Sequence, residues 1–280
     1  MFPLEFAKTM FMKEVVRPYN YKRLEVLFKN GPDIYPGAEY IVKKDGQKYY
    51  IGNVNVTMEE GDILYRHLQD GDPVLMNRQP TLLPMSFGTH KIKVSEKENH
   101  DTFDLNIMSN DQYHFDFDGD EMNSLICNHV QSLVEMKYLS TPSNRIISYI
   151  NGKLLIGQKQ DSIIGGYLLT REEVNMDLMF TIRLHSNTSL NLNMVKFGDK
   201  ISGKQALSLN LPLISYQGKS AYYDPIFSKY IQYKPSDEKF IVELGEIKSG
   251  YYDKGVQDFE KLMALTLDSQ LALNTLFSIQ

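Results

Sequence analysis

The feature that most constrains this chain is the run DFDGDEMN, in which Asp116, Asp118 and Asp120 stand at alternate positions. Three carboxylates so close together repel one another strongly unless a cation neutralises them. A small hard cation such as Mg²⁺ takes oxygen ligands at about 2.0–2.1 Å, so neighbouring ligand oxygens lie roughly 3 Å apart. Alternate residues of a straight strand lie roughly 6.6 Å apart, so the segment must curl. Gly119 supplies the backbone freedom that such a metal-binding loop needs.

The residues around the aspartates distinguish a metal loop from a solvated acidic turn. Phe115, Phe117 and Met122 interleave apolar side chains with the acids. A freely solvated turn has little use for such side chains. We therefore expect part of the loop to be anchored in a hydrophobic core.

Composition sets broad limits on function. The chain has 280 residues, enough for one large or two smaller domains, and its formal net charge of −5 argues against a general electrostatic grip on nucleic acid. Any nucleic-acid role then needs local basic residues or other subunits. Cys127 is the single cysteine, which excludes an internal disulfide and a cysteine-cluster zinc site and fits an intracellular protein. The sequence has no apolar run long enough to span a membrane, and we expect no membrane partner.

The first half of the chain has the pattern of many short strands. A helix is expected around Leu24–Phe28, ended by Asn30-Gly31-Pro32. From Tyr40 to Val94 short β-rich segments alternate with Gly- and Asp-containing turns, and another strand is expected at Thr102–Met108. This spacing favours a barrel over a parallel sheet with crossover helices.

Near residue 140 the pattern of short β-rich segments gives way to a mixture of helical and strand-like segments. This change predicts two domains, residues 1–140 and 141–280. Val130–Leu139 and Ser202–Leu209 are expected to be helical, and Phe240–Ile247 is expected to be a strand. Val256–Ile279 is expected to form one helix with an apolar stripe. That helix stops without a clear cap, so we expect an incomplete second domain, from an excised piece or a split gene.

Other known motifs share features with this acidic run. An EF-hand fails, because counting from Asp116 puts Glu121 and Cys127 where that loop needs glycine and glutamate. The run also resembles the DFDGT signature of haloacid-dehalogenase phosphatases, with Asp116 as nucleophile and Asp118 as general acid/base, but Asp120 replaces the threonine. This phosphatase reading stays as an alternative.

Two further segments resemble phosphate-binding motifs. Gly198–Gln205 matches the start of a P-loop but places Gln205 where a Ser or Thr must meet Mg²⁺, so we interpret it as a loop that leads into a helix. In Asn77-Arg78-Gln79-Pro80 the proline fixes the backbone and biases Gln79 toward an extended form. Arg78 on such a rigid turn presents planar donors to phosphate or sugar oxygens, although taken alone it is more often a surface arginine.

Taken together, these motifs resemble the largest (β′-type) subunit of multisubunit DNA-dependent RNA polymerases. The family's NADFDGDEMN stands here as HFDFDGDEMN, and its NRQPSLH as NRQPTLLPMSFGTH. The segments EVVRPYN, NGPDIYPGAEY and GDPVLMNRQP upstream, and IGQKQDSIIGGYLLT, SGKQALSLNLP and GEIKSGYYDKG downstream, follow the family's order from about residue 14 to residue 255.

The resemblance implies an α+β fold, with a double-psi β-barrel active-site domain followed by a mixed α/β pore domain. It implies that Asp116, Asp118 and Asp120 hold one tightly bound catalytic Mg²⁺ and that a second Mg²⁺ arrives with the nucleotide. The implied reaction is Mg²⁺-dependent nucleotidyl transfer, which adds NTPs to the RNA 3′ end on a DNA template by a two-metal mechanism.

The resemblance also implies further contacts and partners. The implied partners are the second-largest subunit and other subunits, template DNA, nascent RNA and NTPs. Lys91 and Lys93 are implied to contact the backbone of the RNA–DNA hybrid. The implied substrate-binding residues are Arg78, Gln79, Pro80 and His114.

Departures from the family pattern are informative. His114 replaces an asparagine that helps to sense the ribose 2′-hydroxyl, and Phe115 replaces an alanine, which puts ribose selection in doubt. The family's histidine after NRQPS is displaced, with Leu83 or Pro84 near its place and His90 further on. Such drift indicates a divergent lineage such as a large DNA virus. We expect the chain in a virus factory or virion if it is viral, and in the nucleus if it is from a cellular eukaryote.

Family elements outside these residues limit what the chain does alone. The N-terminal zinc site, the bridge helix and the trigger loop have no counterpart in the sequence, so we expect activity only in the multisubunit complex. A second alternative is a non-catalytic, degenerate scaffold of the same family. The intact aspartates speak against it, since a dead site has no reason to keep three mutually repelling charges.

Overall fold

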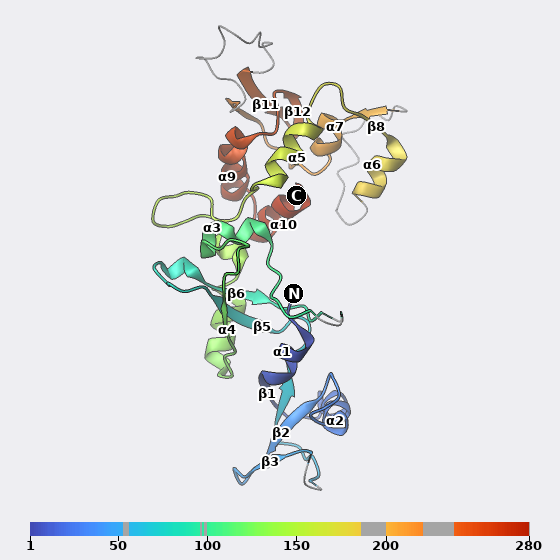
Figure 1. The fold of residues 1–280 in the computed structure, drawn as a ribbon, viewed down its shortest axis with the longest axis vertical. Coiled ribbons are helices and arrows are strands. Elements are labelled where there is room, and N and C mark those ends of the chain that lie inside the picture. Colours follow the sequence, from blue (N-terminus) through green and yellow to red (C-terminus); the bar gives the residue numbers. More distant parts are fainter. Residues whose placement is uncertain (53–55, 96, 98–99, 186–199, 221–237, 280) are drawn as a thin grey trace. The chain divides into compact units, whose positions relative to one another are not determined.

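The computed structural model describes residues 1–280 except 53–55, 96, 98–99, 186–199, 221–237 and 280. The chain divides into two compact units. Unit 1 comprises Met1–Asn106 and Tyr113–Pro142, and unit 2 comprises Ile107–Gln112 and Ser143–Gln280. Both units combine helices with antiparallel sheets, which confirms the α+β class (Figure 1).

Unit 1 holds the first two sheets. Its elements, together with the short segment that crosses into unit 2, are α1 (Leu4–Thr9), β1 (Phe11–Val15), α2 (Tyr21–Asn30), β2 (Ala38–Val42), β3 (Lys48–Tyr50), β4 (Ile63–His67), β5 (Pro73–Asn77), η1 (Pro84–Ser86), β6 (Phe87–Lys91), η2 (Ile107–Ser109), α3 (Asn110–Tyr113), β7 (Asn123–Leu125) and α4 (Val130–Tyr138).

The first sheet of unit 1 is antiparallel with the order β1-β4-β2-β3. Side chains alternate across a strand, so one face carries the buried Leu64 and Ile41. Leu24 and Leu27 of α2 belong to the same core cluster, and the helix ends at Gly31 with φ of 69°. The predicted helix and its stop at Asn30-Gly31 are confirmed, because Gly31 adopts a backbone conformation that favours glycine.

The second sheet has the order β6-β5-β7 and carries the residues predicted to be functional. In its register Asn77 pairs with Asn123 and Val74 pairs with His90. Its buried side chains Val74 and Met76 form one core cluster with Phe115. Burial of such apolar surface, about 25 cal/mol per Å², fixes this sheet and the segment that leads into the aspartates.

The expected closed barrel is not seen, since the strands of the described residues form separate open sheets. Consecutive strands β4 and β5 belong to different sheets because a tight turn bends the chain between them. Arg66 at the end of β4 binds both carboxylate oxygens of Asp72, at 2.7 and 2.8 Å, and also Glu14 at 2.9 Å. This largely buried network ties the turn to β1. The predicted strand at Thr102–Met108 is also wrong, because residues 103–106 are irregular and a 3-10 turn follows.

The described residues of unit 2 form short helices and two small sheets. Its elements are η3 (Pro142–Arg145, which begins at the unit boundary), α5 (Asp161–Leu169), β8 (Asn175–Asp177), α6 (Leu178–Leu184), β9 (Lys200–Ser202), α7 (Gly203–Ser208), β10 (Tyr216–Lys219), β11 (Lys239–Glu243), β12 (Glu246–Ser249), η6 (Lys254–Val256), α9 (Gln257–Thr266) and α10 (Ser269–Ile279).

An aromatic cluster forms the core of unit 2 around the antiparallel sheet β10-β11-β12. The ring centroid of Phe240 on β11 lies 5.8 Å from that of Phe259 on α9 and 6.2 Å from that of Tyr252. All three side chains are fully buried. Edge-to-face packing of this kind holds α9 on the sheet.

Two predictions for unit 2 were wrong in the same way. Phe240–Ile247 is a hairpin rather than one strand, because Leu244 and Gly245 adopt positive φ of 49° and 83° and reverse the chain. Val256–Ile279 is two helices, because Leu267 takes an extended conformation (φ −93°, ψ 159°) that ends α9. The helices predicted at Val130–Leu139 and Ser202–Leu209 are confirmed as α4 and α7.

In the part of the chain that the structure describes, every helix is too short or too polar to cross a lipid bilayer.

Candidate metal centre

The aspartate loop lies between α3 and β7 in unit 1. His114 follows α3 with φ of 52°, an uncommon conformation for a side chain larger than glycine. Phe115 is buried in the core, whereas Phe117 is 69% exposed, so one of the two flanking phenylalanines anchors the loop. A turn at residues 117–119 then reverses the chain.

Backbone hydrogen bonds curl the loop around its own carboxylates. The backbone N–H of Asp116 donates to Oδ2 of Asp120 at 2.9 Å, and that of Asp118 donates to Oδ1 of Asp116 at 3.1 Å. Gly119 has φ of 111°, a conformation that a side chain would strain. All three aspartates are exposed residues, although the side chain of Asp120, which is paired with Arg78, is only 22% exposed.

Arg78 is the direct neighbour of the loop. Its Nε lies 2.8 Å from Oδ2 of Asp120, and its Nη2 donates to Oδ1 at 3.0 Å. Sheet register explains the contact, because Arg78 directly follows β5 and Asp120 precedes β7, its antiparallel partner. The hydrogen bond from Arg78 lowers the pKa of Asp120, with a smaller effect of the Asp116 N–H, and the same contact raises the pKa of Arg78.

The donor set of the loop fits a hard divalent cation in kind. Ionised carboxylates are acceptor-only groups, and oxygen ligands are those that Mg²⁺ prefers. In their present arrangement, however, the described residues contain no group of three acidic, histidine or cysteine side chains placed to hold a metal. The reason is visible at Asp120, whose two oxygens are taken by Arg78 and by the backbone of Asp116.

The other predicted site residues lie around this loop. Gln79 and Pro80 are exposed and continue the turn from Arg78. Among the described contacts, none links Lys91, Lys93 or His114 to the aspartates. Lys91 and Lys93 are exposed at and beyond the end of β6, and Lys93 is held there by its carbonyl, which accepts from Phe2 N–H at 2.8 Å.

Sequence reasoning did not find the partly buried pair that His90 and Tyr113 form next to the loop. His90 Nε2 lies 2.6 Å from the hydroxyl of Tyr113, the last residue of α3. Burial lowers the pKa of His90 to about 4, so the ring is neutral near pH 7. The pair fixes the start of the aspartate loop. His90 and Tyr113 are too far apart in the sequence for any local pattern to indicate their contact. It depends on the sheet register, in which His90 on β6 is the partner of Val74 on β5.

With this geometry established, the comparisons with known proteins define the class. The family model for RNA polymerase Rpb1, domain 2, matches residues 1–141, and that for RNA polymerase Rpb1, domain 3, matches residues 145–266. The chain belongs to the family of largest subunits of DNA-directed RNA polymerases. The phosphatase alternative is therefore set aside; consistently, a short helix rather than a buried strand precedes the aspartates.

Relatives from viruses and archaea show the same membership. The chain is 34% identical to the RPB1 homolog of African swine fever virus (strain Badajoz 1971 Vero-adapted) over 266 residues, which is 90% of this chain and 18% of that protein. It is 34% identical to RNA polymerase subunit 1 of Acanthamoeba polyphaga mimivirus over 221 residues, 75% of this chain and 15% of that protein. It is 35% identical to subunit Rpo1N of Thermococcus celer over 273 residues, 90% of this chain and 29% of that protein. The chain thus spans under a third of the length of these relatives.

Proposed function

We propose that this chain is the catalytic-centre segment of a DNA-directed RNA polymerase, active in nucleotidyl transfer only within the multisubunit complex. One observation carries the proposal: three exposed carboxylates stand on a single curled loop beside the ordered guanidinium of Arg78. The family membership supports it. Residues 1–140 then form the active-site domain, and residues 141–280 form part of the pore domain.

The three carboxylates differ in how many of their oxygens already accept a hydrogen bond. Asp118 accepts no hydrogen bond in the described contacts, so its oxygens are free to bind a cation. Asp116 keeps one oxygen free, since only Oδ1 accepts from Asp118 N–H. Asp120 must exchange Arg78 for the ion. Asp116, Asp118 and Asp120 would together hold one Mg²⁺, which would supply Lewis-acid chemistry to lower the pKa of the RNA 3′-hydroxyl, and a second ion arriving with the NTP would stabilise the pyrophosphate leaving group.

Arg78 has a second task in this proposal. Once released from Asp120, its planar donors face the sugar or phosphate oxygens of an incoming NTP, with Gln79, Pro80 and His114 beside it. Lys91 and Lys93 contact the backbone of the RNA–DNA hybrid, which gives local positive charge to an acidic chain. The partners are the second-largest subunit and other subunits, template DNA, nascent RNA and NTPs, in an intracellular setting.

The test of the metal role is Asp118→Asn in the assembled enzyme. We expect RNA extension on a template–primer scaffold to fall by at least about a hundredfold, because an amide binds Mg²⁺ far less well than a carboxylate. The fold should be unchanged, since Asp118 is exposed. Glu121→Gln is the matched control, because it removes an exposed charge next to the loop. Normal extension by the Asp118 variant would refute the assignment.

A second test addresses ribose selection. His114→Ala should reduce the preference for NTPs over dNTPs in single-nucleotide addition. The substitution removes the polar side chain that stands where the family has its asparagine. An unchanged ratio would remove His114 from the substrate site.

A further inference from the structure

The turn that carries Arg78 is closed by a hydrogen bond between two side chains. Asn77, the last residue of β5, stands at the start of the turn, and Thr81 stands at its end. The hydroxyl of Thr81 donates to Oδ1 of Asn77 at 2.7 Å. The bond therefore spans Arg78, Gln79 and Pro80, which lie between the two residues.

Asn77 is the fixed partner of this pair. Its strand β5 is the middle strand of the sheet β6-β5-β7, and the residue is buried. Its register partners are Phe87 on β6 and Asn123 on β7. A strand paired on both sides leaves its backbone little freedom, and burial restricts the side chain as well. Asn77 thus offers an acceptor oxygen at a defined position.

Thr81 is the exposed partner on the far side of the turn. Its branched side chain has few rotamers, so the hydroxyl keeps one direction once the hydrogen bond has formed. Pro80 directly before it has a fixed φ. The hydroxyl therefore ties an otherwise exposed turn back to the sheet.

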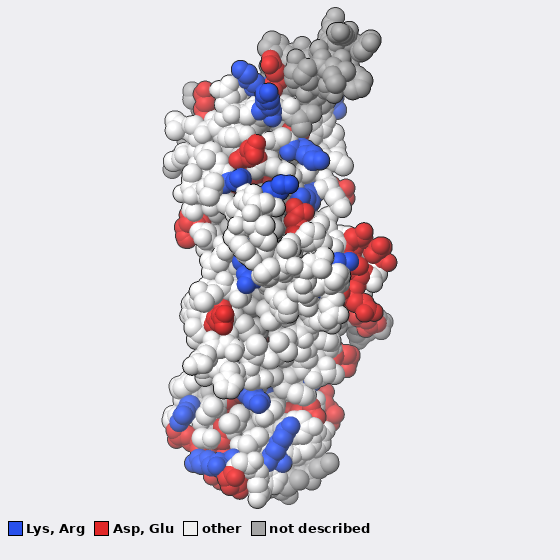
Figure 2. Space-filling view, turned by 90° about the vertical axis from the view of Figure 1, so that its left-hand side faces the viewer, with Lys and Arg blue, Asp and Glu red and all other residues white. Residues whose placement is uncertain are grey.

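Arg78 depends on local constraints of this kind for its direction. On the face of the molecule that Figure 2 shows, basic side chains are scattered, and many lie near an acidic one. Arg78 likewise meets a single carboxylate, with its Nε 2.8 Å and its Nη2 3.0 Å from the two oxygens of Asp120. The planar guanidinium makes both contacts only in one orientation. Such a contact depends on where the turn places the backbone of the arginine.

We propose that Asn77 and Thr81 are positioning residues, which hold the turn so that Arg78 is directed toward Asp120 in the free chain and toward an incoming NTP in the assembled enzyme. The second role rests on the proposed function, whereas the first concerns atoms of this chain alone. Without the Thr81 hydroxyl, the turn loses the tie between its two ends, and Arg78 samples several directions. The loss weakens substrate binding and leaves the aspartates untouched.

The first measurement is the ¹⁵N–¹H NMR signal of the Arg78 Nε–H group, recorded on the full chain in magnesium-free buffer. Arg78→Lys identifies this signal by removing it. Thr81→Val keeps the shape of the side chain without its hydroxyl, and it should shift the signal toward that of a solvated arginine. Thr81→Ser should restore the signal. The matched control is Thr102→Val, which changes another exposed threonine of unit 1, outside the turn.

The second measurement is single-nucleotide addition by the assembled enzyme. Thr81→Val should raise KM for the NTP about three- to tenfold and change kcat less than about twofold, because it weakens substrate binding rather than the chemical step. Thr81→Ser should keep KM close to the original value. In an Arg78→Ala background Thr81→Val should have no further effect, since both substitutions remove the same interaction. A merely structural effect of Thr81 would add to that of Arg78.

The two measurements separate this inference from the proposed function. Normal extension by Asp118→Asn would refute the catalytic assignment, and the Arg78 signal would still report whether Thr81 orients the arginine. The inference is overturned if Thr81→Val leaves that signal or KM unchanged, or if Thr81→Ser fails to restore them. It is also overturned if the effects of Thr81→Val and Arg78→Ala on KM are additive.

Discussion

The guanidinium of Arg78 contacts both carboxylate oxygens of Asp120, a residue 42 positions further along the chain. The pairing of β5 with β7 creates this contact, since Asn77 and Asn123 are register partners. A cation thus already occupies one of the three carboxylates that we assign to Mg²⁺. In the proposed function, metal binding and substrate positioning are therefore linked through a single arginine.

This link predicts that Arg78→Ala raises the Mg²⁺ affinity of the chain while lowering RNA extension by the assembled enzyme. An ion pair at the protein surface is weak, so releasing Asp120 should tighten Mg²⁺ binding only modestly, by up to about fivefold. Extension should fall because the nucleotide loses its donor. Titration with MgCl₂ measures the first effect, and Lys91→Ala, which removes a charge without touching Asp120, is the control. Weaker Mg²⁺ binding by the Arg78 variant would contradict the link.

The partly buried pair of His90 and Tyr113 predicts that unit 1 is sensitive to acid. Folding lowers the pKa of His90 from 6.5 to about 4, so the unfolded chain binds more protons between these values. Stability is then fully present above pH 6.5 and falls as the pH drops toward 4, by about 1–3 kcal/mol given that the residue still reaches the surface. Urea unfolding across this range should show the loss. His90→Gln should flatten it, and identical slopes for both proteins would exclude His90 as the cause.

The turn between β4 and β5 predicts a large cost for one substitution. Asp72→Ala leaves Arg66 buried with Glu14 as its remaining acidic partner, beside the carbonyl of His67, and breaking a buried pair costs about 3–5 kcal/mol. We expect a value near the lower end from urea unfolding, because Glu14 remains. Arg66→Met combined with Asp72→Leu should recover most of the loss. Glu60→Gln, an exposed charge change in unit 1, should have little effect. A small effect of Asp72→Ala would show that the turn does not depend on this network.

The raised pKa of Glu260 predicts that the stability of unit 2 falls as the pH rises, the opposite of the effect of His90 on unit 1. Its pKa rises from 4.5 to about 7 on folding, so the folded state binds more protons between these values. Its contribution to stability is full below pH 4.5 and is lost as the pH rises through 7, by up to about 3 kcal/mol. Glu260→Gln retains an acceptor for Tyr252 and Gln158 and should remove this dependence. Thermal unfolding monitored from pH 5 to 8 checks it, and a stability that rises with pH in both proteins would count against the assignment.

Local signals in the sequence were sufficient where one short segment decides its own structure. The Gly31 stop of α2 and the extent of α4 follow from residues within a few positions of each other. The same logic failed at Leu267, where nothing in the apolar stripe indicates that the helix ends. It failed again at Leu244-Gly245, where a hairpin interrupts a run that looks like one strand.

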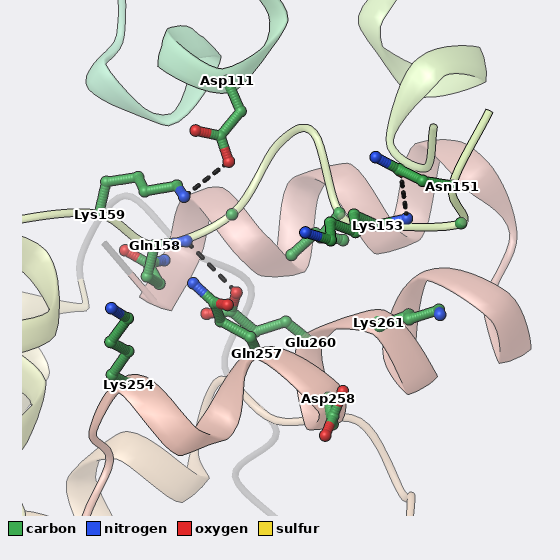
Figure 3. Close-up of a pocket in the computed structure, with 13 residues that line it drawn as sticks. Asp111, Asn151, Lys153, Gln158, Lys159, Lys254, Gln257, Asp258, Glu260 and Lys261 are labelled. Atoms are coloured by element: carbon green, nitrogen blue, oxygen red, sulfur yellow. Dashed lines mark hydrogen bonds and ion pairs between the residues drawn. The ribbon is translucent and has the colours of Figure 1, made fainter. Parts of the chain in front are cut away.

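The sequence by itself determined the membership of the family and the three acidic groups on one loop, because both depend on residue type and spacing along the chain. Tertiary structure alone decided that Asp120 meets Arg78, that His90 meets Tyr113, and that Glu260 accepts a hydrogen bond from the backbone of Gln158 (Figure 3). These relations join residues tens of positions apart or more. Sheet register and the packing of buried side chains place such residues together, and neither is encoded in any one segment.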